Sequence, residues 1–326
     1  MRRRDFIKAV AGSGVFLGPV LASAQQQGSP VIGFLDSRTP EVVASRLRGF
    51  RQGLKENGYV EGENVAIVYR WAEDQLDRLP VLATDLVHRP AAVIVASGPP
   101  SAFAAKAATT TIPILFVVGA DPVELGLATS LSRPSGNMTG INVASSELAS
   151  KRLELLHDLL PRATRIAVLV NPADARPTEL KDVNAAARSM GLQIQVHNAN
   201  TSAEIDAAFA AMGRERPDAV FVGVTPFFNG RRVQLTQLAT FHHLPAIYAG
   251  REYAEVGGLM SYGSDIVDAF RQSGVYAGRI LKGAKPGELP IVQGSKIELV
   301  INAQTARMLG LSIPAPLLNR ADEVID

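Results

Sequence analysis

The chain has 326 residues, of which 47% are hydrophobic and 20% charged, as is typical of a soluble globular protein with room for two lobes. It has no cysteine, which excludes disulfides, iron–sulfur clusters, thiolate nucleophiles and cysteine zinc sites, and we expect no lipoprotein anchor. The first 24 residues carry a net charge of +3 and the whole chain +2, so the remaining −1 offers no electrostatic footprint for nucleic acid.

An export signal is predicted at the N-terminus. Arg3-Arg4-Asp5-Phe6-Ile7-Lys8 resembles the twin-arginine signature, an apolar region covers 9–21, and Ala22-Ser23-Ala24 supplies the small residues of a cleavage site. The apolar region is too short and too rich in glycine to span a bilayer comfortably. An ordinary Sec signal or an uncleaved amphipathic start is the alternative. We expect residues 1–24 to be removed near Ala24 and the mature protein to reside in the periplasm.

After the signal, strands and helices alternate along the chain. The first part is predicted to hold strands over 31–35, 65–70, 92–96 and 114–118 and helices over 40–57, 75–88 and 102–108, with Ser101 as the N-cap of the third helix. Residues 139–143 are predicted to cross to a second lobe. The second part is predicted to hold strands over 166–170, 193–197, 219–222, 246–248, 259–262 and 296–301. Its predicted helices cover 147–160, 178–190, 203–215, 231–242 and 265–282, and Asn302 caps a short helix that ends at Gly310.

The chain repeats itself at an interval of more than a hundred residues. Arg89-Pro-Ala-Ala-Val-Ile-Val-Ala-Ser-Gly-Pro-Pro100 is similar to Arg216-Pro-Asp-Ala-Val-Phe-Val-Gly-Val-Thr-Pro-Phe227, and Ile112-Pro-Ile-Leu-Phe116 is similar to Leu244-Pro-Ala-Ile-Tyr248. Two such copies are too few and too far apart for a solenoid. They indicate two similar lobes with a ligand cleft between them, although an ancestral duplication without a shared site would leave the same pattern.

The predicted fold class is therefore α/β, with two similar doubly wound parallel-sheet lobes joined by a multi-strand hinge. We predict that the first lobe comprises residues 28–143 and 263–290, and the second residues 144–262 and 291–326. The length of chain between the copies favours at least three crossings, which would allow the lobes to close on a ligand.

Polar and aromatic residues follow the predicted strands at their carboxyl ends, where open parallel sheets bind ligands. Ser97-Gly-Pro-Pro-Ser101 precedes a helix, where free N–H groups and the helix dipole favour a carboxylate; a capped helix start with nothing bound is the alternative. Asp121 would neutralise an ammonium group, unless it only bonds its own turn. Tyr262 and Phe227 would flank a planar ligand. The predicted ligand-binding residues are Asp36, Ser37, Ser97, Gly98, Ser101, Asp121, Asn171, Thr225, Phe227 and Tyr262.

Catalytic motifs are missing from the mature chain. It has no Gly-x-Ser-x-Gly elbow, no phosphate loop and no Gly-x-Gly-x-x-Gly. His242 and His243 are adjacent on a predicted helix, so that their rings diverge and cannot easily share a metal. We therefore predict that the protein is not an enzyme and has no metal or cofactor. A hydrolase on the same scaffold remains an alternative.

Several blocks of the mature chain resemble one bacterial family. They are Pro113-Ile-Leu-Phe-Val-Val-Gly-Ala-Asp-Pro-Val-Glu-Leu-Gly-Leu127, Ser132-Arg-Pro-Ser-Gly-Asn-Met-Thr-Gly140, Ile280-Leu-Lys-Gly-Ala-Lys-Pro286, Glu298-Leu-Val-Ile-Asn302 and Leu309-Gly-Leu-Ser-Ile-Pro314. The similarity is to the substrate-binding proteins of ABC transporters, in the group that binds tryptophan or related aromatic amino acids. It extends over essentially the whole mature chain.

The resemblance implies a type I periplasmic-binding-protein fold and a receptor that delivers a small-molecule ligand to an ABC permease in the inner membrane. We expect a monomer that binds no nucleic acid. By motif match, the Ser97–Ser101 loop, Asp121 and the region of Tyr262 would contact the ligand. Many relatives have Gly-Thr-Pro where this chain has Gly98-Pro99-Pro100, which removes a hydroxyl and a backbone donor. A ligand-sensing module for a membrane receptor is the alternative to transport.

Overall fold

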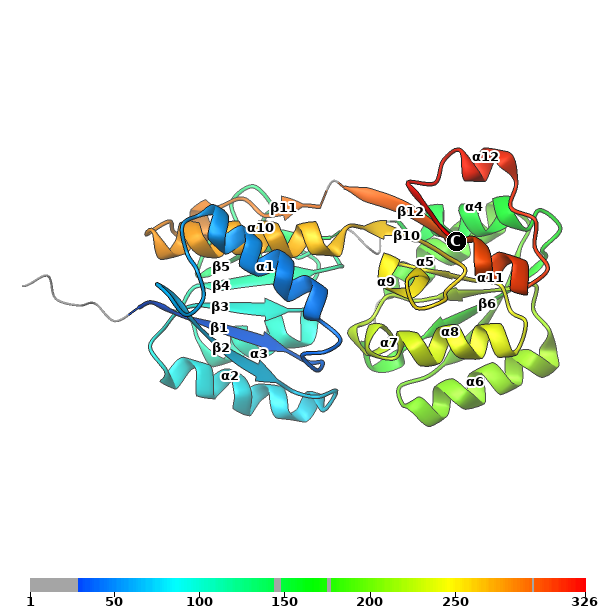
Figure 1. Ribbon diagram of the computed structural model, residues 1–326. Helices are drawn as coiled ribbons and strands as arrows, with labels where there is room; N and C mark the ends of the chain where they lie inside the picture. The colour runs from blue at the N-terminus through cyan, green and yellow to red at the C-terminus, as the bar shows by residue number, and fades with distance from the viewer. Residues whose placement is uncertain (1–28, 144–147, 175–176, 295) are drawn as a thin grey trace, which may run out of the picture.

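The computed structural model describes residues 29–143, 148–174, 177–294 and 296–326, and shows two α/β lobes side by side (Figure 1). The predicted export signal lies outside the described residues. Each lobe is built on one sheet, with strand order β11-β5-β4-β3-β1-β2 in the first and β13-β12-β10-β9-β8-β6-β7 in the second. The predicted α/β fold of two doubly wound, parallel-dominated lobes is thus confirmed.

The first sheet is parallel throughout and buried on both faces. One face packs against α1 and α10, and the other against α2 and α3. The near-continuous apolar runs of its central strands fit this arrangement, because a strand covered on both sides needs no polar face. The strands are β1 (Val31–Asp36), β2 (Ala66–Trp71), β3 (Ala91–Ser97), β4 (Ile114–Val118), β5 (Met138–Asn142) and β11 (Val292–Gln293); the helices are α1 (Ala44–Glu56), α2 (Leu79–His88), α3 (Pro99–Ala108) and α10 (Ile266–Leu281).

The second sheet is also parallel, except that β12 runs antiparallel to β10. Helices α4, α5, α11 and α12 cover one face, and α6, α7 and α8 the other. The strands are β6 (Arg165–Val170), β7 (Gln193–Asn198), β8 (Ala219–Val222), β9 (Ala246–Tyr248), β10 (Met260–Ser264), β12 (Ile297–Asn302) and β13 (Glu323–Ile325). The helices are α4 (Ala149–Leu159), α5 (Pro177–Ser189), α6 (Ser202–Glu215), α7 (Pro226–Gly230), α8 (Arg232–Phe241), α9 (Arg251–Ala254), α11 (Ala303–Met308) and α12 (Ala315–Leu318).

Three stretches of chain pass from one lobe to the other: between β5 and α4, between β10 and α10, and between β11 and β12 (Figure 1). They lie together. The Ser264 hydroxyl donates to the Val143 carbonyl, and the Gly294 N–H donates to the Asn142 carbonyl over 2.7 Å. β11 extends the first sheet beyond position 290, where we predicted the first lobe to end, and β10 continues the second sheet to Ser264. A two-residue edge strand has too few residues to show a period in sequence.

Helices α1 and α10 touch backbone to backbone on the face of the first sheet. A Cβ added to Gly53 would lie 1.8 Å from the carbonyl oxygen of Arg271, so glycine is required there. This contact fixes α1, which carries Arg46 toward the second lobe, against α10, which carries Phe270.

Helix α3 begins three residues earlier than predicted. Its N-cap is Gly98, and Ser101 lies inside the helix rather than capping it, so that prediction was wrong. Pro99 and Pro100 occupy the first two helical positions, where a missing N–H costs little and the fixed φ of proline suits the helix. The two prolines also remove two backbone N–H donors from the N-terminal end of α3, which faces the second lobe.

Candidate functional site

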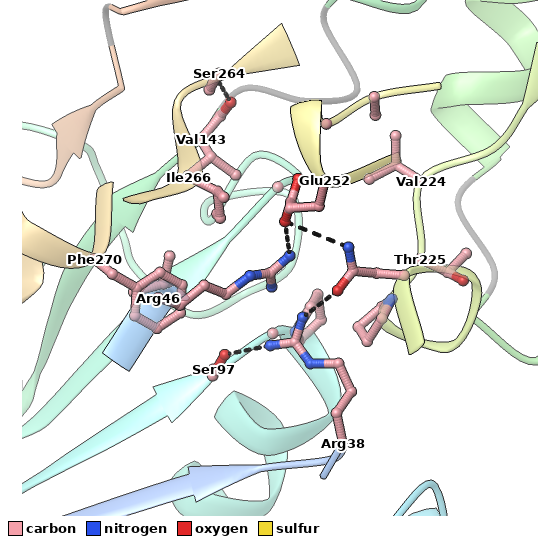
Figure 2. A pocket seen from close by; sticks show the side chains of 18 of the residues that line it. Arg38, Arg46, Ser97, Val143, Val224, Thr225, Glu252, Ser264, Ile266 and Phe270 are labelled. Atoms are coloured by element: carbon pink, nitrogen blue, oxygen red, sulfur yellow. Dashed lines mark hydrogen bonds and ion pairs between the residues drawn. The ribbon is translucent and has the colours of Figure 1, made fainter. Parts of the chain in front are cut away.

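A cavity lies between the two lobes, at the carboxyl ends of the central strands of both sheets (Figure 2). We call it the inner cavity. The centre of a water-sized sphere can move through about 100 Å³ of it, several times the room that one water needs. Its polar wall is formed by Arg38, Arg46 and Ser97 of the first lobe and by Thr225, Asn229 and Glu252 of the second.

Arg38 is held in a fixed position on the floor of the inner cavity. Its Nε and Nη2 donate to the two carboxylate oxygens of Asp36 over 2.8 and 2.7 Å, and Nη2 also donates to the Ser97 hydroxyl over 2.8 Å. Its Nη1 reaches across to the Asn229 side-chain oxygen at 3.2 Å. Burial would raise the pKa of Asp36, but the Arg38 guanidinium outweighs burial and holds that pKa below its usual value. Arg38 therefore has an acceptor at each of its three nitrogens.

Arg46 and Glu252 form an ion pair that joins the lobes inside the inner cavity. Nη2 of Arg46, on α1, lies 2.7 Å from Oε1 of Glu252, on α9, and both side chains are about 10% exposed. Burial would raise the pKa of Glu252, but Arg46 outweighs it and that pKa is lowered. The buried Nε of Arg46 has no hydrogen-bond partner among the described residues. Arg46 thus keeps more unused donor capacity than Arg38, which makes four hydrogen bonds from its five N–H groups.

Most of the remaining lining of the inner cavity is apolar. Phe270 of α10 lies against the Arg46 guanidinium, whose Cζ is 5.9 Å from the ring centroid, and these side chains lie together in Figure 2. Val117, Val143, Val224 and Ile266 complete this wall. The inner cavity therefore has one charged end and one apolar end, as sites for small organic molecules usually do.

Prolines of both lobes, Pro99 and Pro226, line the inner cavity. Gly98 has φ of +86°, and a Cβ there would lie 3.2 Å from the Cγ of Pro226 on the other lobe. Pro226 opens α7 just as Pro99 opens α3, so that each helix presents a proline ring at its first position. Pro226 also lines a second space between the lobes.

We call that second space the outer crevice. It is roomier, with about 310 Å³ open to the centre of a water-sized sphere, and its lining includes Ser37, Leu76, Asn171 and Phe227. Asp74 and Arg231 bridge it from the two lobes, with Oδ2 and Nη1 at 2.7 Å. Its acid and its base are thus paired with each other across the gap.

The family model of the ABC transporter substrate binding proteins matches residues 40–325. This chain belongs to that family. A tyrosine-binding protein of Clostridioides difficile (strain R20291) is 27% identical over 265 residues, which cover 81% of this chain and 76% of that protein.

Two solved structures are similar over 91% of this chain and all of their own. One is a conserved domain protein from Vibrio cholerae O1 biovar eltor, with a TM-score of 0.85 and 28% identity. The other is an ABC domain in complex with L-Trp from Streptococcus pneumonia, with a TM-score of 0.83 and 26% identity. The fold is the type I periplasmic-binding-protein fold that the resemblance implied, and the family is one of substrate-binding proteins.

The structure brings some of the predicted site residues together at the gap between the lobes. Ser97, Gly98 and Thr225 line the inner cavity, and Asp36 lies directly behind Arg38. Three more predicted residues, Ser37, Asn171 and Phe227, line the outer crevice.

The other three predicted residues lie elsewhere. Ser101 is wholly buried in α3, and its hydroxyl has no hydrogen-bond partner among the described residues. The Asp121 carboxylate accepts from the N–H of Val123 over 2.7 Å, the turn-forming role that we weighed as its alternative. Tyr262 packs against the core of the second lobe. None of the three lines the inner cavity.

Sequence reasoning did not select Arg38, Arg46, Asn229, Glu252 or Phe270. Arg38 lies in the loop after β1, and Glu252 lies in the short helix α9 that follows β9. A position after a strand is the signal by which other residues were chosen, and a preference for charged residues there would have found both. Arg46 and Phe270 lie on helices that were predicted, but nothing in sequence indicates that they reach the gap between lobes.

Within the described residues, no group of three or more histidine, aspartate or glutamate side chains could hold a metal ion. In the same part of the chain, the helices are too short or too polar to cross a bilayer.

Proposed function

We propose that the protein is the solute receptor of an ABC importer, and that it captures a small amino-acid-like ligand in the inner cavity. The observation that carries this proposal is that both lobes supply the charged wall of one cavity, with Arg46 from the first and Glu252 from the second. A ligand held there contacts both lobes at once. Binding then favours the closed arrangement by the difference in the ligand's affinity for the closed and open forms.

The relatives support an amino acid as the ligand. One is a tyrosine-binding protein and another was solved with L-Trp. The apolar end of the inner cavity, with Phe270 and several aliphatic side chains, suits the side chain of such a ligand. Closure excludes water, which strengthens the polar contacts at the other end.

The remaining parts of the proposal concern place and partner. Residues 1–24 direct export, and the mature chain from about residue 25 acts in the periplasm. The two lobes that close on the ligand are the lobes predicted from the sequence, and their borders lie at the three crossings. An ABC permease in the inner membrane receives the ligand from the closed form.

A thermal-shift panel tests the proposal. The mature protein is scanned with L-amino acids, aromatic acids, sugars and nucleosides, because a ligand that binds only the folded state raises the unfolding midpoint. Each positive compound is then titrated by calorimetry and checked for chemical change by chromatography. We expect saturable binding of an amino acid, recovered unaltered. A panel without any binder, or turnover of the bound compound, would contradict the proposal.

A further inference from the structure

The charges of the inner cavity balance. Arg38 is neutralised by Asp36, with which it shares two hydrogen bonds, and Arg46 is neutralised by Glu252. All four side chains are buried or nearly so. A ligand with a net charge would therefore leave an uncompensated charge in a place where water screens it poorly, and such a charge is costly. A zwitterion adds no net charge.

Within this balanced set, Arg46 is the guanidinium with more N–H groups left for a ligand anion. All three nitrogens of Arg38 already donate to protein oxygens. Arg46 donates only from Nη2, to Glu252, and its buried Nε has no acceptor among the described residues. A guanidinium binds a carboxylate through parallel N–H bonds from two of its nitrogens, and Nε is one nitrogen that can take part.

Two of the helix ends that face the gap, those of α3 and α7, are poorly suited to this role. Pro99 and Pro100 begin α3, and Pro226 begins α7, so these positions offer no N–H to an anion. The anion site that helix N-termini usually provide is thereby weakened. A side chain is therefore a better carboxylate site in the inner cavity than the ends of these two helices.

We propose that Arg46 and Glu252 together select a zwitterionic head group: Arg46 binds the carboxylate and Glu252 binds the ammonium. This inference rests on the proposed function and assigns the two residues that decide its ligand class. Because Arg46 belongs to the first lobe and Glu252 to the second, the two charges of one ligand tie the lobes together. A ligand that lacks either charge engages one lobe only, so it both binds and closes the protein more weakly.

The test compares three amino acids with analogues that lack one charge. The probes are L-phenylalanine, L-tyrosine and L-tryptophan, their desamino acids (3-phenylpropionate, 4-hydroxyphenylpropionate and indole-3-propionate) and their amines (phenethylamine, tyramine and tryptamine). Calorimetric titration of the wild-type protein is expected to show each analogue at least tenfold weaker than the tightest amino acid.

Two conservative variants assign the charges. Arg46→Gln should lower the preference for the amino acid over the amine to within about threefold, and Glu252→Gln should do the same for the preference over the desamino acid. A purely structural role would weaken all probes by one factor and leave these ratios unchanged. Arg51→Gln, also on α1, and Glu255→Gln, just after α9, are the matched controls, and both should keep the wild-type ratios; their side chains are about half exposed.

The possible failures are distinguishable. If a sugar, a nucleoside or a singly charged probe binds more tightly than every zwitterion, the head-group assignment is overturned while the receptor function stands. Unchanged ratios in both variants would also overturn it. If no compound of the whole panel binds the wild-type protein, the receptor function itself is refuted, and the head-group assignment with it.

Discussion

Asp74 and Arg231 join the two lobes at the outer crevice, away from the inner cavity. Their carboxylate and guanidinium are 2.7 Å apart, and the side chains are 16% and 31% exposed. Arg231 is held in place by a 2.8 Å hydrogen bond from its Nε to Ser202 and by the ring of Phe227, 5.5 Å from its Cζ. Asp74 and its neighbour Glu73 both have left-handed backbones, with φ of +63° and +54°. An unfavourable backbone thus presents Asp74 to the other lobe, and we expect the pair to favour closure.

The expected loss of affinity follows from how exposed the Asp74–Arg231 pair is and from how firmly Arg231 is held in place. Exposed ion pairs contribute about 0–1 kcal/mol, and the fixed position of Arg231 places this pair at the upper end of that range. About 1 kcal/mol corresponds to a factor of about five. When the closed form is the minor one, a ligand that needs it loses affinity by the same factor. We therefore expect Asp74→Asn and Arg231→Gln each to raise the Kd by about three- to fivefold.

Calorimetric titration of the tightest amino acid gives the Kd for wild type, both single variants and the double variant. The double variant should bind no more weakly than either single variant, because one interaction is lost in all three. At high salt, screening should raise the Kd of the wild type close to the Kd of the variants. Glu73→Gln is the control, since it breaks only an exposed pair with Arg78 inside the first lobe. Strictly additive losses, or a changed order of preference among ligands, would refute closure by this pair.

Three further predictions follow from single residues. Gly98→Ala should lower the thermal unfolding midpoint and weaken ligand binding at least fivefold. The backbone conformation of Gly98 costs a non-glycine residue about 1–3 kcal/mol, and the new Cβ would press on Pro226. An unchanged midpoint and an unchanged affinity would count against the close contact. Glu179→Ala should destabilise the fold by about 3–5 kcal/mol in urea unfolding, because the fully buried Arg152 loses its carboxylate partner; a loss below about 1 kcal/mol would contradict this. Since the pKa of Glu252 is lowered in the folded protein, the ligand Kd should stay constant from pH 7 to about 5 and rise only as the pH falls through that lowered pKa; weakening already near pH 6 would show the opposite shift.

Much of the scaffold could be predicted because it depends on local patterns. The strands ending at Asp36 and Ser97 are apolar runs closed by polar residues, and the structure has them within two residues of the predicted bounds. Elements of four residues or fewer, such as α9 and β11, are too short to show a period. The N-cap of α3 was predicted at Ser101 because serine is a preferred N-cap residue. In the structure, two prolines extend the helix to an N-cap at Gly98.

The charged pair of the inner cavity could not be predicted from local pattern. Arg46 and Glu252 are 206 positions apart and meet only because the two lobes face each other. Arg46 reads as one of several exposed arginines on an amphipathic helix, and its neighbours Arg48 and Arg51 are indeed exposed. For Tyr262 the local pattern was also insufficient, because a position at the end of a strand does not reveal which face of the sheet the ring covers.

A crystal structure of the mature protein with the tightest amino acid of the panel tests the account most directly. We expect ligand density in the inner cavity, with the carboxylate at Arg46, the ammonium at Glu252 and the side chain against Phe270. Density confined to the outer crevice, between Phe227 and Arg231, would contradict it.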